Sequence, residues 1–289
     1  MPPLLSLKSA GRLSIAEEAR TLMVLEEFFG RTGAKARAFF RVLGEMFALL
    51  GLSVYWSMSV VAGRARIRRS DLFVQMVRVG VDALPIVVLC NVFVGMILAV
   101  STAELLDSLG VLSWTAQVVG VATTRELSPL MTAIIMSGFV GAAMAAEIGA
   151  MTASEEVLAL ETSALNPIRF LVVPRLWAVM AMLPCLTVIA DVAGMFGGYL
   201  IGTLFFGIGP VRYITLNNSS LYLKDIIAGL IKAEAFAVII TIVACQQGLA
   251  VRGGAVGVGR ATTNSVVYSI FLLIFSNLFF ATLFNYVMM

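Results

Sequence analysis

Residues 125–175 read RELSPLMTAIIMSGFVGAAMAAEIGAMTASEEVLALETSALNPIRFLVVPR. The stretch opens on the charged pair Arg125-Glu126, continues as an almost uncharged apolar run, and then becomes acidic. A second long apolar run begins at Pro174-Arg175. Apolar runs of about 20 residues have the length of a membrane-spanning helix. This order predicts one span, a short amphipathic segment suited to docking on another protein, and a second span.

The composition of the whole chain agrees with a membrane protein. Of its 289 residues, 60% are hydrophobic and 13% are charged, and the mean hydropathy is +0.98. Soluble domains carry about 25% charged residues. The apolar runs are long enough for helices, so the sequence predicts an all-α integral membrane protein.

Five spans are expected, with an additional helix before them. Residues 38–62 are apolar and long enough for a span but contain Arg41 and Glu45, so we expect an amphipathic helix at the membrane interface, with a full span as the alternative. Residues 1–37 are expected to form a cytoplasmic lead-in, 38–78 the interfacial helix and a basic connector, and 79–289 the membrane domain. The expected spans are residues 79–101, 112–146, 176–206, 226–248 and 263–287.

Basic residues predict the orientation. Twelve of the twenty Lys and Arg residues precede position 79, and four of them cluster at positions 64, 66, 68 and 69. Basic segments beside a span stay in the cytoplasm, which explains the cluster better than a nucleic-acid partner does. We therefore expect a cytoplasmic N-terminus and a C-terminus on the opposite side of the membrane.

The sequence contains few residues suited to catalysis or metal binding. It has no histidine, and its three cysteines are widely separated within apolar runs, so no metal site is predicted. None of its four lysines follows a glycine, which rules out a phosphate-binding loop of the Walker type. We expect a chain that is not an enzyme, binds no cofactor and does not itself hydrolyse nucleotide.

Charged residues inside the spans are the best site candidates. A charge at the centre of a membrane helix costs about 2.5–3.5 kcal/mol on insertion scales, so each one needs a partner or water. Arg125 and Glu126 are adjacent and, on an α-helix, are not expected to pair with each other. The sequence offers Asp225 and Lys232 as partners, and we expect a polar cluster of these four residues.

Residues 152–165 predict a short cytoplasmic helix. Thr152 and Glu155 have the spacing of a capping box, and Asn166-Pro167 is a termination signal. An apolar stripe and an acidic surface fit docking to a partner protein, although an ordinary interfacial helix has the same pattern. The residues assigned to this docking surface are Glu155, Glu156, Leu158, Leu160 and Glu161.

Small residues predict close helix packing. Gly194, Gly198 and Gly202 recur every four residues and form a groove along the third span. Gly138, Ala142 and Ala146 form a similar stripe on the second span. The sequence leaves open whether such a stripe packs within one subunit or between two.

Several motifs in the same order resemble the MlaE/YrbE permease family, from about Val79 to the C-terminus. They are Arg125 to Pro129, Ala145 to Met151, Asn166-Pro167, Asp191 to Gly198, Asp225 with Lys232, and Gly257 to Thr263.

The resemblance implies a homodimeric ABC permease in the inner membrane of a bacterium, with a periplasmic C-terminus. It also implies a separate cytoplasmic ATPase that binds ATP and magnesium, a hexameric MCE-domain lipid-binding protein in the periplasm, and a small cytoplasmic accessory subunit. The family moves phospholipids or other hydrophobic molecules between the inner and outer membranes. By the same resemblance, the segment from Glu147 to Leu165 is the coupling helix, and Arg260 joins the charged positions near the pocket.

The chain departs from the family pattern at Phe139 and Asn264, where some relatives carry basic residues, and at its longer N-terminus. Two other functions stay open at this point. An ion-coupled secondary transporter could use Glu126, Asp191 or Asp225 as proton sites, and a scaffold for a lipid-binding partner would transport nothing.

Overall fold

The computed structural model describes residues 41–60, 62 and 69–288, and these residues form helices without a strand. The chain divides into two compact units, residues 1–48 and residues 49–289. The predicted lead-in, residues 1–37, and most of the basic cluster lie outside the described residues. All the helices from Arg69 onward belong to the second unit.

Six helices of the described part are long and apolar enough to cross a membrane, where the sequence predicted five spans and an interfacial helix. The additional one is the predicted interfacial helix, which is apolar enough to be counted with the others despite its charges. The six are Arg41–Val60, Leu72–Ser108, Leu112–Ala153, Ile168–Leu204, Leu223–Leu249 and Gly254–Tyr286.

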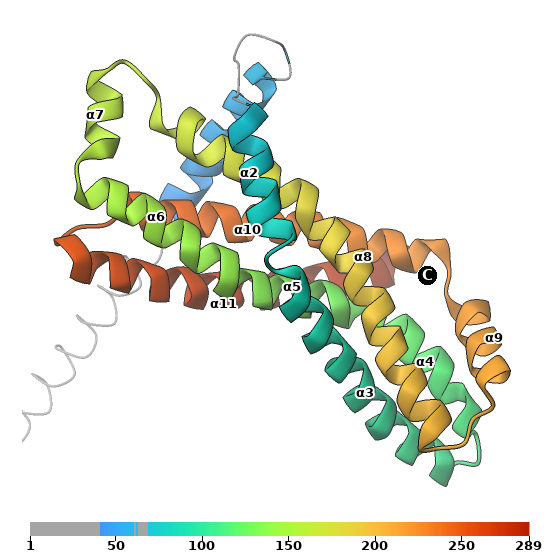
Figure 1. Cartoon of the computed structure of the whole chain (residues 1–289). Helices are drawn as coiled ribbons and strands as arrows, with labels where there is room; N and C mark the ends of the chain where they lie inside the picture. The colour runs from blue at the N-terminus through green and yellow to red at the C-terminus, as the bar shows by residue number, and fades with distance from the viewer. Residues whose placement is uncertain (1–40, 61, 63–68, 289) are drawn as a thin grey trace, which may run out of the picture. The chain divides into compact units, whose positions relative to one another are not determined.

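The helices carry the labels of Figure 1. In chain order they are α2 (Arg69–Gly80), α3 (Leu84–Ser108), α4 (Thr115–Ala122), α5 (Ser128–Met136), α6 (Ala142–Ala153), α7 (Glu156–Thr162), α8 (Val173–Leu204), α9 (Pro210–Ser220), α10 (Leu223–Leu249) and α11 (Gly254–Met288). A 3-10 turn, η1 (Leu112–Trp114), precedes α4. Two π-helical turns, η2 (Thr123–Leu127) and η3 (Ser137–Gly141), interrupt the helix Leu112–Ala153, and a third, η4 (Ile168–Val172), begins the helix that continues as α8.

The second predicted span is one continuous helix that is longer than predicted. It runs from η1 through α4, α5 and α6 over 42 residues and contains both η2 and η3. The sequence places Pro129 one residue beyond the end of η2, after Ser128, and a proline cannot donate the backbone hydrogen bond that an α-helix requires at that position. Isolated π-turns within α-helices are frequent at functional sites.

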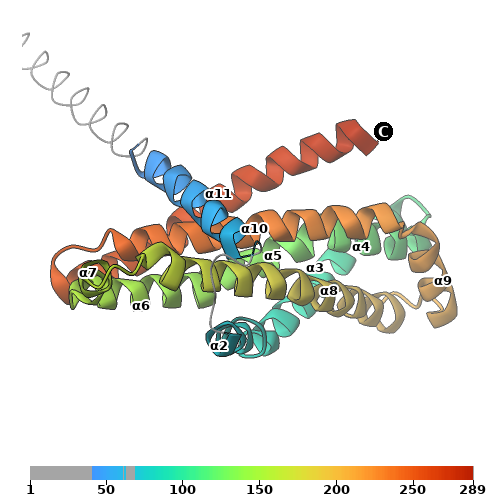
Figure 2. The same ribbon diagram turned by 90° about the horizontal axis from the view of Figure 1, so that it is seen from above.

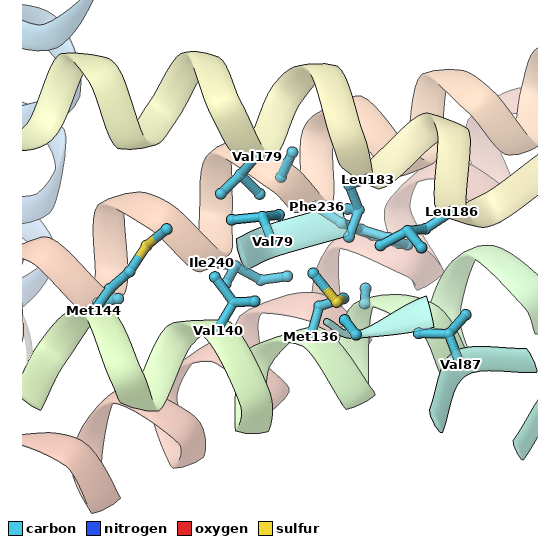
Figure 3. Packing of buried hydrophobic residues seen from close by; sticks show 14 of the residues in the cluster. Val79, Val87, Met136, Val140, Met144, Val179, Leu183, Leu186, Phe236 and Ile240 are labelled. Atoms are coloured by element: carbon cyan, nitrogen blue, oxygen red, sulfur yellow. The ribbon is translucent and has the colours of Figure 1, made fainter. Parts of the chain in front are cut away.

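The core lies where α2, α3, α5, α6, α8 and α10 meet. Val79, Met136, Leu183, Phe236 and Ile240 are fully buried there, and Figure 3 shows them pointing toward one another. In Figures 1 and 2, α7 lies at one end of the helices, whereas α9 and the end of α11 lie at the other. The second span therefore connects the α9 end to the α7 end.

The glycine groove of the third span packs within the chain. A side chain at Gly194 would meet Thr123 and Asn91, and a side chain at Gly202 would meet the ring of Tyr213. Gly198 faces Val119 and the Tyr213 hydroxyl. These contacts hold α3, α4 and α9 against α8, which favours the intramolecular alternative for this stripe.

The helix of the third predicted span starts earlier than predicted. Asn166 does not end the docking helix. Instead, its side-chain oxygen accepts hydrogen bonds from the backbone N–H groups of Ile168 (3.0 Å) and Arg169 (3.3 Å). An asparagine in this position caps the beginning of a helix. The helix therefore starts at Ile168, eight residues before the predicted span.

Candidate functional site

A buried ion pair joins the second span to α10. Lys232 Nζ lies 2.6 Å from Glu126 Oε2, and the Lys232 side chain is 0% exposed. Lys232 also donates a hydrogen bond of 3.1 Å to the backbone oxygen of Arg125. That oxygen needs another donor because Pro129, four residues on, has no N–H. The expected contact between Glu126 and Lys232 is present.

The π-turn η2 changes the relation of Arg125 to Glu126. On an α-helix adjacent side chains diverge, yet Arg125 Nε lies 3.9 Å from Glu126 Oε1. A π-turn has more residues per turn than an α-helix, so neighbouring side chains diverge less. Our expectation that these neighbours could not approach each other was therefore wrong, because it assumed regular α-helical geometry.

Asn277 is a member of the cluster that the sequence did not predict. Its Nδ2 donates a hydrogen bond of 3.4 Å to Glu126 Oε2 from α11. The available signal was an amide within the apolar run of the last span. The prediction considered charged side chains as partners for Glu126 and therefore passed over a neutral donor.

Asp225 and Arg260 lie away from this ion pair. Asp225 precedes Lys232 by seven residues, which is about 10 Å along a helix axis. Its Oδ2 accepts a hydrogen bond of 3.2 Å from the backbone N–H of Tyr222 and so caps α10. Arg260 is exposed near the start of α11, about 25 Å along that helix from Asn277. The predicted four-residue cluster is therefore reduced to Arg125, Glu126 and Lys232.

A pocket of about 800 Å³ opens beside Arg125 and Glu126. It is formed by the second span near its α9 end, by Ser220, and by the C-terminal part of α11. Its wall is mostly apolar along α4, where Gln117 is the exception, and mostly polar at η2 and along α11. The lining residues are Gln117, Val118, Val121, Ala122, Arg125, Glu126, Ser220, Ala281, Thr282 and Asn285.

Next to the pocket, α9 is held by a buried tyrosine. Tyr213 is 2% exposed and packs on Ala116 and Ile208. Burial raises the pKa of the Tyr213 phenol to about 12. The ring also makes an edge contact with Tyr199 at a centroid distance of 5.7 Å.

Glu147 lies between two arginines near the other end of the second span. Its carboxylate forms ion pairs with Arg78 of α2 and, at 3.1 Å, with Arg175 of α8. Arg175 Nη1 also donates a hydrogen bond of 2.8 Å to the Leu171 carbonyl. Glu147 thereby connects the end of α6 to two other helices, and it does not belong to α7.

We predict that Glu147→Gln destabilises the protein by about 1–3 kcal/mol, because it leaves the buried Arg175 guanidinium without its counter-charge. Arg78 is 53% exposed, so Arg78→Ala is expected to cost only about 0–1 kcal/mol. Thermal unfolding of both variants in detergent measures the difference. Equal losses of stability in the two variants would mean that the ion pair of Glu147 with Arg175 contributes no more than the one with Arg78.

The predicted docking helix is shorter than expected. α6 continues to Ala153, and Thr152 Oγ1 donates to the Ile148 carbonyl at 2.8 Å within it. Glu155 has a φ of 62° and lies before α7 begins. The predicted capping box is therefore absent from this segment, because the alanine-rich α6 extends through its first position.

α7 is an acidic helix whose side chains are mostly exposed. Glu155, Glu156 and Glu161 are exposed and Leu160 is half-buried. Leu158 is 54% exposed, and the helix contains no buried residue. An apolar side chain presented to solvent among carboxylates, on a helix that joins two spans, suits contact with another chain.

The MlaE permease family model matches residues 72–283. A probable ABC transporter permease protein of Rickettsia typhi is 40% identical over 203 residues, which cover 70% of this chain and 78% of that protein. A similarly named protein of Synechocystis is 38% identical over 220 residues, covering 76% and 84%. The intermembrane phospholipid transport system permease protein MlaE of Haemophilus influenzae is 32% identical over 250 residues, covering 85% and 93%.

Proposed function

The chain belongs to the MlaE permease family, and we propose that it moves phospholipids or other hydrophobic molecules between the inner and outer membranes of a bacterium. It is a multi-pass membrane protein and an ABC transporter permease. The name of the Haemophilus influenzae relative supports phospholipid as the substrate class.

One observation carries the mechanism. The continuous helix of residues 112–153 has the polar-ended pocket near one end and is joined to α7 at the other by the short turn of Ser154 and Glu155. Movement of α7 can therefore reach the pocket through a single helix, with π-turns at η2 and η3 as the places where it can bend. The apolar wall accommodates acyl chains, and Arg125 provides a positive charge for an anionic headgroup.

The energy source in this proposal is a separate cytoplasmic ATPase that binds ATP and magnesium and contacts α7. Two copies of this chain form the permease, and the exposed apolar surface of α11 is available to lipid or to the second copy. An MCE-domain protein on the periplasmic side receives or delivers the lipid, and a small cytoplasmic accessory subunit completes the assembly. The α7 end and the N-terminus face the cytoplasm, and the C-terminus faces the periplasm.

An ion-coupled transporter is the weaker alternative. Two of the three carboxylates that it could use are held in structural contacts: Glu126 is paired with Lys232, and Asp225 caps a helix. The third, Asp191, is buried, and its Oδ1 has no hydrogen-bond partner in the described part of the chain. Family membership supports ATP as the energy source.

We predict that Leu158→Asp strongly weakens binding of the ATPase without unfolding the permease. The side chain is exposed, so its replacement changes few internal contacts. A carboxylate in an apolar contact costs several kcal/mol when that contact is buried by a partner. We expect the amount of ATPase that co-purifies in mild detergent to fall at least about tenfold, which corresponds to about 1.4 kcal/mol.

The matched control is Leu105→Asp, which places the same charge at an exposed leucine near the end of α3 that lies away from α7. This variant should retain the ATPase. If both variants retain it equally, α7 is not the docking element and the proposed coupling is wrong.

A further inference from the structure

A second pocket, of about 780 Å³, lies within the unit 49–289 where the helix that ends at Val60 faces α8 and α10. It shares no lining residue with the pocket at Arg125 and Glu126. Its volume falls in the range of about 300–1,000 Å³ that is typical of small-molecule sites. Most of its wall is apolar, and the large side chains in it are Leu50, Val54, Met58, Leu176, Trp177 and Met180.

The walls of this pocket are held together by specific contacts. Trp177 Nε1 of α8 donates a hydrogen bond of 3.1 Å to Ser57 Oγ of the preceding helix. The Arg169 guanidinium lies over the Trp56 ring at 5.7 Å and over the Phe170 ring at the same distance. The contacts of Trp177 with Ser57 and of Arg169 with Trp56 join the segment around residue 57 to the long helix Ile168–Leu204, and they hold the two walls of the pocket together without a ligand.

Among the described residues that line this pocket, Glu234 is the only ionisable one. Its Oε2 is buried and has no hydrogen-bond partner in the described part of the chain. Lys232 is two residues away on α10, but residues two apart point to opposite sides of a helix, and Lys232 contacts Glu126. Glu234 as a whole is only partly buried, but a carboxylate whose buried oxygen lacks a counter-charge is costly, so this position favours a ligand that supplies one.

We propose that this pocket binds an amphiphile with an apolar body and a single primary amine, whose ammonium group donates hydrogen bonds to Glu234. The apolar wall takes the hydrocarbon part, and the carboxylate takes the cation. An alcohol would satisfy the acceptor but would leave the negative charge uncompensated, so an amine is the better match. The site does not depend on the transport function, because it is lined by other residues than the substrate pocket.

The test uses the full-length purified chain in nanodiscs of phosphatidylcholine, a lipid whose headgroup has no N–H donor. Octadecylamine is added to one sample and octadecanol to another, and thermal unfolding is followed in both. Saturating octadecylamine is expected to raise the Tm by about 5 °C, since a ligand that binds only the folded state stabilises it. Equal stabilisation by octadecanol would overturn the assignment of an amine.

Two variants locate the effect. Glu234→Gln keeps the shape of the side chain and removes its charge, and it should abolish the stabilisation by octadecylamine. Glu104→Gln removes an exposed carboxylate elsewhere and should leave the stabilisation unchanged. If Glu234→Gln does not fold, Val54→Phe provides a second route, because it fills the pocket while Glu234 is kept. Full stabilisation in either pocket variant would show that the amine binds elsewhere.

Discussion

Glu126→Gln should strongly destabilise the protein, because it leaves the Lys232 ammonium buried without a counter-charge. Removing one partner of a buried ion pair costs about 3–5 kcal/mol. Glu126 itself is 33% exposed, so the lower end of that range applies, about 3 kcal/mol. For a chain of this size we expect the Tm to fall by about 6–10 °C. Thermal unfolding in detergent measures the change.

Removal of the other partner is expected to cost less. Lys232→Met replaces the buried ammonium with an apolar side chain of similar length, and Glu126 keeps both its exposure and the Asn277 hydrogen bond. The double variant Glu126→Gln with Lys232→Met should therefore be more stable than Glu126→Gln alone, because no buried charge is left unpaired. If the double variant is the less stable of the two, the ion pair is not what stabilises this region.

Exchanging the two charges tests the contact itself. The double change Glu126→Lys with Lys232→Glu should retain more folded protein than either single change. Recovery should be incomplete, because a carboxylate at position 232 would face the Arg125 carbonyl oxygen that Lys232 now contacts. A double exchange no better than the single changes would contradict the pairing.

The sequence predicted the parts of the molecule that depend on simple patterns. Long apolar runs identified the spans, and a scarcity of charged residues within them left few possible partners for Glu126, among them Lys232. The family motifs agreed with both. The predicted boundaries were less accurate, because polar caps and π-turns extend a helix beyond the apolar run that marks it. Asn166, for example, caps a helix that begins at Ile168, before the third predicted span.

Other features depended on local geometry that no pattern of residue types shows. Asp225 was expected at the ion pair because it shares a helix face with Lys232. A carboxylate in the first turn of a helix, however, lies close to unpaired backbone N–H groups, and Asp225 accepts a hydrogen bond from that of Tyr222. Thr152 and Glu155 match a capping box, yet the preceding alanines continue the helix past Thr152 to Ala153. Asn277 was missed because the prediction looked for charged partners, whereas a neutral amide can also donate a hydrogen bond to the carboxylate of an ion pair.

The tight contact between α3 and α8 predicts a large loss of stability in Gly95→Leu. A Cβ atom at Gly95 would collide with the backbone of Gly194, and one at Gly197 would collide with the backbone of Val92. Backbone atoms cannot move aside as the end of a flexible side chain can, so the two helices must separate. We expect a loss of about 3 kcal/mol or more, at the upper end of overpacking costs, and little folded protein on expression.

Helix propensity sharpens this expectation. Replacing glycine with leucine inside a helix should by itself favour the helix by nearly 1 kcal/mol, so a loss at Gly95 has to come from packing. The matched control is Gly138→Leu on the second span, where a Cβ meets nothing within 4 Å in the single chain. We expect its thermal unfolding temperature as a monomer to stay the same or to rise slightly, because no packing loss offsets the gain in helix propensity. If Gly138→Leu remains folded but no longer forms a dimer on size-exclusion chromatography, the stripe of Gly138, Ala142 and Ala146 packs between two subunits, while the glycines facing α3 pack within one. A folded, stable Gly95→Leu would instead mean that α3 and α8 are not held at this distance in the membrane.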